Sequence, residues 1–286
     1  MSSSATKTGT GQAAARKKKE IAVIGCGKMG TILLEAFLER KLAGPENVIA
    51  TVQHAEKCQA ISIDLGGIAL GTDNRAAAAD APVVLLSVKP QALPQVLEEI
   101  APALAPDALV ISIAASTTVG FIEQKLGKDV AVVRAMPNTP AMVGAAMTAL
   151  SAGTSVRPEQ LATAKRLFEA VGRVVIVDEK HMDAITALSA SGPAFVFVIL
   201  ESLAEAGVKV GLPREMATTL AAQTLFGSAK LALETGHHPA LLKDAVTTPA
   251  GCTIEGLMEL ERGGLRVTLM NAVITTTKRA RELMTG

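Results

Sequence analysis

A glycine motif directly after a buried strand constrains this chain most. Residues 25–30 read GCGKMG, follow the apolar run Ile21–Ile24 and open a helix expected over residues 28–40. In a G-x-G-x-x-G motif the first glycine permits a tight turn, the second lets the backbone approach a pyrophosphate, and the third lets helix and strand pack closely. The helix N-terminus adds amide donors and a partial positive charge. We therefore predict a dinucleotide site formed by Gly25, Gly27, Lys28, Met29 and Gly30.

The strand and helix patterns alternate up to Asp178. We expect strands over residues 21–24, 48–50, 83–88, 109–113, 130–133, 146–150 and 174–177, and helices over 28–40, 91–100, 119–126 and 158–170. Alternation of buried strands with helices is typical of a parallel sheet covered on both faces. The predicted fold class is α/β, with a Rossmann-type, doubly wound, mainly parallel sheet in a dinucleotide-binding domain over residues 20–178.

The strand pattern ends after Asp178, and Ala/Leu-rich segments broken at Gly and Pro follow. We expect helices over residues 182–189, 194–208, 214–234, near 241, 254–261 and 265–283. This predicts an all-helical substrate and dimerisation domain over residues 179–286. Its helices are apolar over broader arcs than one small domain can bury. We therefore infer a homodimer that exchanges helices or pairs face to face.

Charge and cysteine content exclude several classes of protein. Lys plus Arg total 28 and Asp plus Glu total 27, so a net charge of +1 argues against nucleic acid as a partner. Three scattered cysteines suggest neither a metal site nor disulfides, and favour the cytoplasm. No uninterrupted run of about 18 apolar residues predicts a membrane span. Residues 1–19 end in a basic cluster without an apolar core, which is typical of a disordered tail rather than a secretory signal; targeting or nucleic-acid contact is the alternative.

Missing residue types narrow the chemistry. The chain has no Tyr, which excludes a reductase with a catalytic phenol, and no Lys between Lys180 and Lys209, where a β-hydroxyacid dehydrogenase would carry its catalytic lysine. The four histidines lie in turns or at element edges, where solvated side chains are the common case. A substrate with a protonated C=N bond needs no strong acid, because it is already electrophilic. The composition therefore fits reduction of an imine.

The end of the second strand bears on nucleotide preference. An NAD-specific site usually has an acidic residue there for the ribose, but residues 47–55 contain none and include Thr51, Gln53 and His54. This favours NADPH, with NADH as the alternative. The same residues also fit a solvated turn without a role at the cofactor.

Four further segments, in order along the chain, carry a family resemblance. They are Ser87–Gln91, Arg134–Pro140, Leu188–Ala194 and Thr247–Leu257. With them the chain closely resembles the pyrroline-5-carboxylate reductase family, from about Ile21 to Leu283. Independently of the family, ligands bind at the carboxyl ends of strands in open α/β sheets, and Ser87–Pro90 falls there.

The last of these segments predicts a carboxylate pocket. Thr248, Gly251 and Thr253 precede an expected helix, so hydroxyls and free amides converge there. Plain N-capping by Thr248 or Thr253 is the alternative.

The resemblance implies reduction of 1-pyrroline-5-carboxylate to L-proline with NAD(P)H, the last step of proline biosynthesis, in a homodimer or a larger even homo-oligomer such as a decamer. It implies that Thr253 relays the ring nitrogen's proton, and that the segment Leu188–Ala194 closes the site opposite the nicotinamide. The expected catalytic residue is Thr253; the expected substrate residues are Thr248, Gly251, Cys252, Thr253 and Ser191; the expected cofactor residues are Gly25, Gly27, Lys28, Met29, Gly30, Asn74, Ser87, Lys89, Pro90, Ala114, Ala115 and Asn138.

The chain departs from the family pattern in the substrate loop. The family usually has Ser-Pro-Gly-Gly, whereas residues 248–251 read TPAG. A left-handed Ala250 would cost about 1 kcal/mol. Val52 stands where the family often has a small polar residue for the 2′-phosphate. Two rival functions stay open: a reductase of another cyclic imine or ketimine acid, and a non-catalytic NADP-binding dimer.

Overall fold

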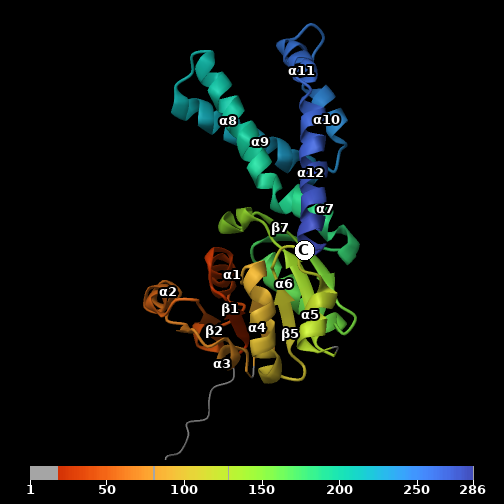
Figure 1. The fold of residues 1–286 in the computed structure, drawn as a ribbon. Coiled ribbons are helices and arrows are strands. Elements are labelled where there is room, and N and C mark those ends of the chain that lie inside the picture. Colours follow the sequence, from red (N-terminus) through yellow and green to blue (C-terminus); the bar gives the residue numbers. More distant parts are fainter. Residues whose placement is uncertain (1–18, 80, 128, 286) are drawn as a thin grey trace, which may run out of the picture.

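A computed structural model describes residues 19–285 except 80 and 128, so all but the last residue of the expected tail lies outside the described residues. The described chain forms one sheet with helices on both faces, from which a group of long helices projects (Figure 1). The strands are β1 Ile21–Ile24, β2 Val48–Thr51, β3 Ala69–Gly71, β4 Val83–Leu86, β5 Leu109–Ser112, β6 Ala131–Met136, β7 Ala146–Ala152 and β8 Gly172–Ile176.

The strand order is β3-β2-β1-β4-β5-β6-β7-β8. Neighbouring strands are parallel except β6 and β7, which run antiparallel. The strand order reverses between β1 and β4, which is the point where open α/β sheets bind their ligands. The predicted mainly parallel, doubly wound sheet is confirmed.

Each face of the sheet carries its own apolar core. One core contains Phe37 of α1 and Phe168 of α6, and the other contains Leu97 of α4 and Ile122 of α5. Both faces of the central strands are therefore buried, which explains their continuous apolar sequence. The helices against the sheet are α1 Lys28–Glu39, α2 Cys58–Asp64, α3 Asn74–Ala78, α4 Leu93–Ile100, α5 Val119–Leu126 and α6 Pro158–Glu169.

Three elements between residues 52 and 82 were not expected from the sequence. They are α2, β3 and α3, of seven, three and five residues. Elements this short show little hydrophobic periodicity. The one local sign was Asp73, whose carboxylate accepts a hydrogen bond from the amide of Ala76 at 2.8 Å and caps α3.

The rest of the chain is helical, as predicted. It comprises α7 Met182–Ile185, a π-helical turn Thr186–Ala190, α8 Gly192–Lys209, α9 Arg214–Thr235, α10 Pro239–Ala245, α11 Cys252–Arg262 and α12 Leu265–Thr285. Helices α8 and α9 project from the sheet as a pair, α10 and α11 lie at the far end, and α12 returns to the sheet (Figure 1). Helix α11 begins at Cys252 instead of Ile254, so Thr253 lies in its first turn and does not precede the helix, as the sequence analysis expected.

These projecting helices expose much apolar surface in the single chain. Phe197 and Val198 of α8 are 61% and 62% exposed, and Ile274 of α12 is 64% exposed. By length and composition alone, one helical segment among the described residues, Glu179–Lys209, could cross a membrane. Only 11% of its most apolar stretch is buried. A surface of this kind is typical of an interface with another molecule.

Candidate active site

The glycine motif has the geometry that a dinucleotide requires. Gly25 has φ +83°, a left-handed conformation that favours glycine, and a β-carbon there would meet Val88 Cγ1 at 2.4 Å. Gly30 allows close packing, because a β-carbon would lie 2.9 Å from Ser87 Oγ. A β-carbon on Gly27, the N-cap of α1, would project into open space. This is the space that a pyrophosphate would fill beside the helix N-terminus.

A series of hydrogen bonds supports the glycine motif from the end of the neighbouring strand β2. The Thr51 side chain, only 1% exposed at the end of β2, accepts from the amide of Gly25 at 3.1 Å and donates to Asn74 Oδ1 at 2.7 Å. Asn74 Nδ2 donates to Glu99 Oε2 at 2.9 Å. Asn74 was expected at the cofactor, whereas this supporting role of Thr51 was not predicted from the sequence. Thr51 was missed because this role depends on the pairing of β1 with β2, which no local pattern encodes.

The loops after β4 and β5 reach the same edge of the sheet as the motif. Ser87 packs on Gly30, and Lys89 is exposed at the start of the next short helix. Ala114 is buried, and its amide donates to Ser112 Oγ at 3.3 Å. Ser116 has φ +55°, and such strained non-glycine residues cluster at functional sites. The structure therefore brings the residues expected at the cofactor, from residue 25 to residue 115, to one edge.

An ion pair between a buried arginine and a half-buried glutamate joins this edge to the start of the helical part. Arg134 of β6 is 1% exposed, and its Nη1 lies 3.2 Å from Glu179 Oε1. The same carboxylate oxygen accepts from the amide of Val119 at 2.7 Å, at the N-terminus of α5. Glu179 therefore ties β6, α5 and the chain leading into α7 together. No local pattern predicts these bonds, because Glu179 is 45 residues from Arg134 and 60 residues from Val119.

Asn138 also contacts the helical part. Its amide nitrogen donates to the backbone oxygen of Ser189 at 3.1 Å, and its amide oxygen accepts from the amide of Met147 at 3.0 Å. The sequence analysis placed Asn138 at the cofactor. In the structure, both ends of its side chain are engaged by the protein.

The substrate loop, residues 247–251, contains the left-handed alanine whose cost was considered from the sequence. Ala250 has φ +58°, so the residue replacing the family's glycine is left-handed. Gly251 is the N-cap of α11, no side chain caps this helix, and a β-carbon on Gly251 would lie 2.4 Å from Thr248 Oγ1. Plain N-capping by Thr248 or Thr253 is therefore wrong. Thr248 and Cys252 are exposed, and Thr253 is half-buried.

The structure does not bring all predicted site residues together within one chain. The substrate loop precedes α11 at the far end of α12, whereas the glycine motif lies at the sheet (Figure 1). Ser191 is nearer to the sheet, at the end of the π-helical turn whose Ala190 packs in the same apolar cluster as Ala115. A single chain therefore presents two separate parts of the predicted site.

The Cys26 thiol and the His238 imidazole are poor candidates for acid catalysis. Burial raises the pKa of the Cys26 thiol, and a hydrogen bond with Thr31 opposes this rise to a smaller extent. The Cys26 side chain therefore stays protonated next to the glycine motif. His238 Nδ1 accepts from the amide of Ala240 at 3.2 Å and so serves to cap α10.

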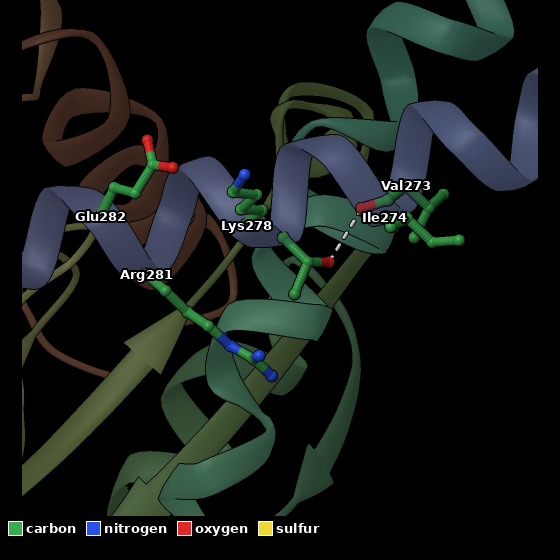
Figure 2. A pocket seen from close by; sticks show the side chains of 6 residues that line it. Val273, Ile274, Lys278, Arg281 and Glu282 are labelled. Atoms are coloured by element: carbon green, nitrogen blue, oxygen red, sulfur yellow. Dashed lines mark hydrogen bonds between the residues drawn. The ribbon is translucent and has the colours of Figure 1, made fainter.

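A shallow groove of about 470 Å³ runs along one face of α12 (Figure 2). Thr277 within it donates to the backbone oxygen of Val273. Arg281 extends away from the helix, and its Nε lies 3.9 Å from Asp183 Oδ2 of α7. The lining residues all belong to α12: Val273, Ile274, Thr277, Lys278, Arg281 and Glu282. The groove belongs to the exposed surface of the helical part and contains none of the predicted site residues.

Comparisons with known proteins agree with this geometry. Residues 20–116 match the family described as NADP oxidoreductase coenzyme F420-dependent, and residues 179–283 match pyrroline-5-carboxylate reductase dimerisation. The chain is 42% identical to a pyrroline-5-carboxylate reductase of Methanosarcina acetivorans over 93% of this chain and 98% of that protein. It is 44% identical to the enzyme of that name from Synechocystis, over 92% and 98% of the two chains.

Solved structures show the same similarity. A pyrroline-5-carboxylate reductase from Coxiella burnetii superposes with a TM-score of 0.86 at 37% identity, over 93% of this chain and 99% of that one. The Plasmodium falciparum pyrroline carboxylate reductase, solved with NADP bound, gives 0.84 at 28% identity, over 94% and 100% of the two chains.

The fold and the glycine motif define a dinucleotide-dependent oxidoreductase. Relatives more than 30% identical over nearly the whole length narrow the assignment from this general class to one family. The chain belongs to the pyrroline-5-carboxylate reductase family, and the predicted resemblance is confirmed. Because residues 179–283 match the family's dimerisation region, another protein subunit, and not only a membrane, can account for the exposed apolar helix.

Proposed function

We propose that this enzyme reduces 1-pyrroline-5-carboxylate to L-proline with NAD(P)H, the last step of proline biosynthesis. The combination of two site segments in one chain carries the proposal: an open glycine motif follows β1, and the substrate-loop segment precedes α11. The chain is also 42% identical to a pyrroline-5-carboxylate reductase over 93% of its length. The substrate's protonated ring nitrogen makes its C5 carbon electrophilic, so the protein mainly orients and desolvates it.

The cofactor lies along the carboxyl edge of the sheet in this proposal. The free amides at the start of α1 hold the pyrophosphate in the open space beside Gly27. Lys89 supplies a positive charge, and Ala114 and Ala115 form the wall beside the nicotinamide. When bound, the reduced nicotinamide supplies the hydride. The remaining cofactor residues are Gly25, Lys28, Met29, Gly30, Ser87 and Pro90. Asn74, whose amide bonds Thr51 and Glu99, contributes by supporting the glycine motif through Thr51.

We propose NADPH as the preferred nucleotide. No carboxylate lies among Val52, Gln53 and His54 at the end of β2, so a 2′-phosphate meets no negative charge on those residues. The imidazole of His54 is 3.9 Å from Glu56, which lies in the next short helix. An ordinary ribose is accepted at the same place, which leaves NADH as the second donor.

The substrate carboxylate is bound by the loop before α11. The helix N-terminus has no side-chain cap, so its amides are free for an anion. Thr248, Gly251 and Cys252 surround that point, and Ser191 contributes from the start of α8. The Thr253 hydroxyl bonds the ring nitrogen and carries its proton, acting as the catalytic residue.

The substrate loop of one subunit lies beside the cofactor bound at the sheet of its partner in this proposal. Within one chain the loop lies at the far end of α12, so it needs a second subunit to meet the cofactor. A second copy that covers the exposed faces of α8, α9 and α12, including the groove of Figure 2, brings the two parts together. We therefore propose a homodimer, or a larger even assembly such as a decamer, formed by residues 179–286 and built on a dinucleotide-binding domain of residues 20–178.

A cytoplasmic enzyme fits these features. Cys26, Cys58 and Cys252 are free, which suits a reducing compartment. A partner subunit, rather than a membrane, covers the apolar segment Glu179–Lys209 in this proposal.

The test is a steady-state assay of the purified enzyme with pyrroline-5-carboxylate and NADPH or NADH, with proline as the measured product. Six-membered cyclic imine acids and linear ketimine acids serve as competing substrates. We expect proline to accumulate, with NADPH giving the higher kcat/KM. Faster turnover of a six-membered imine would favour the first rival function, and tight NADPH binding without any turnover would favour a non-catalytic dimer.

A further inference from the structure

The π-helical turn before α8 contains a backbone oxygen that the helix itself cannot satisfy. In an α-helix the oxygen of Ser189 would accept from the amide four residues later, but that residue is Pro193, which has no N–H. The amide of Ala194 donates instead to the oxygen of Ser191 at 3.0 Å. Asn138 supplies the missing donor from outside the helix: its Nδ2 lies 3.1 Å from the oxygen of Ser189 and 3.4 Å from Ser189 Oγ.

The other end of the Asn138 amide is held as firmly. Its Oδ1 accepts from the amide of Met147 in β7 at 3.0 Å. One half-buried side chain therefore connects the end of β6, the start of β7 and the turn Thr186–Ala190. To contact a cofactor with either polar atom, this amide would give up a bond within the protein.

The turn lies at the edge of the sheet where the cofactor is proposed. Ala190 packs with Ala115, Met136 and Met182 in one small apolar cluster. Ser191 and Gly192 follow directly, and a β-carbon on Gly192 would meet open space. π-Helical turns are rare, and they occur frequently at functional sites. The orientation of the turn therefore determines where Ser191 points.

We propose that Asn138 is a positioning residue, not a cofactor ligand: it holds the π-helical turn so that Ser191 and the start of α8 face the nicotinamide. This inference rests on the proposed function for its catalytic consequence. It replaces the assignment of Asn138 to cofactor binding.

The first test is Asn138→Ala. We expect kcat for pyrroline-5-carboxylate to fall at least tenfold, with the Kd for NADPH within twofold of wild type. Hydrogen exchange of the amides of residues 186–194 should become faster, because the turn loses its external bond. Thr163→Ala is the control: its hydroxyl donates to the backbone oxygen of Glu159 at 2.9 Å within α6, so it loses a side-chain-to-backbone bond away from the turn and should leave all three quantities unchanged.

The second test adds Pro193→Ala to Asn138→Ala. Replacing the proline restores a backbone amide that can donate to the oxygen of Ser189 in place of Asn138. The bond from the amide of Ser191 to the oxygen of Thr186, which closes the π-helical turn, is unaffected. Because the turn regains a donor for this oxygen, we expect the double variant to recover the melting temperature, the slow hydrogen exchange and most of the kcat that Asn138→Ala loses.

Several results would overturn the inference. They are an unchanged kcat in Asn138→Ala, a rise in the NADPH Kd that matches the loss of kcat, and recovery of stability and slow exchange without recovery of kcat in the double variant. Failure of the proposed function looks different, because wild type itself would not turn over. The hydrogen-exchange comparison would then still decide whether Asn138 holds the turn.

Discussion

The sheet region (residues 20–178) and the helical region (residues 179–285) bury their apolar residues to very different degrees. In the first, Phe37, Phe168 and Ile100 are fully buried between sheet and helices. In the second, from α8 onward, the buried residues among those described are alanines, at 204, 217, 221 and 280. Large side chains such as Phe197 stay exposed. The sheet region thus has a complete core of its own, whereas the described helical region leaves large apolar side chains uncovered, which the proposed partner subunit would bury.

The most direct way to break this comparison is a charge on the exposed helical face. Phe197→Asp should give a monomer in light scattering and lower turnover at least about 100-fold, because a buried unpaired charge opposes assembly and the substrate loop then has no partner sheet. NADPH binding should persist, since the sheet region is complete alone. Ile63→Asp, at a 68% exposed site on α2, is the control and should leave assembly intact. An active Phe197→Asp monomer would contradict the proposed completion of the site by a partner.

A substitution in the glycine motif should impair cofactor binding by the sheet region and leave the helical region intact. Gly27→Val places a side chain in the open space beside α1, so the NADPH Kd should rise at least about 50-fold while the oligomer stays assembled. Fluorescence titration measures the first quantity and light scattering the second. An unchanged Kd would refute the interpretation of the glycine motif.

Thr253→Val tests the chemistry carried by the helical region. Loss of one hydroxyl should lower kcat by roughly one to three orders of magnitude and leave the NADPH Kd close to that of wild type. Thr235→Val is a control, because that hydroxyl bonds the backbone of α9 at Leu231. If turnover is retained, Thr253 does not relay the proton.

Ala250→Gly should produce a smaller effect, on stability. Relief of the left-handed alanine is worth about 1–2 kcal/mol, and the greater freedom of glycine in the unfolded chain removes about 0.5–1 of this. Urea unfolding should show a net gain of between zero and about 1.5 kcal/mol. Ala162→Gly, at an exposed position in the middle of helix α6, should instead lose stability. Equal effects of the two substitutions would argue against strain at Ala250.

The smallest expected effect is a difference in alkylation rate between Cys26 of the sheet region and Cys252 of the helical region. Burial raises the pKa of the Cys26 thiol, so between pH 7 and 9 Cys26 should be alkylated far more slowly than the exposed Cys252, as followed by peptide mass spectrometry. Because the folded state keeps the proton, this contribution to stability is present below the thiol's unfolded pKa and is lost as the pH rises above it. Fast labelling of native Cys26 would contradict its burial.

Much of the cofactor edge was predictable from the sequence. Residues 25–30 combine a local turn, a helix start and a strand end, and each of these is encoded within a few residues. Ser87 and Ala114 were placed correctly at the same edge, because the carboxyl ends of parallel strands always meet there. Thr51 and Glu179 were not predicted, since their hydrogen bonds join residues 26 to 60 positions apart.

The sequence alone determined the order of the longer strands and helices, the glycine motif and the absence of a phenol, because hydrophobic period, turn residues and composition are local properties. Only the tertiary structure decided that Ala250 is left-handed, that Asn138 is bonded to the π-helical turn, and that the substrate loop lies far from its own sheet. These depend on which distant segments pack together, and that choice follows from burying apolar surface across the whole chain and its partner, which no short window of sequence records.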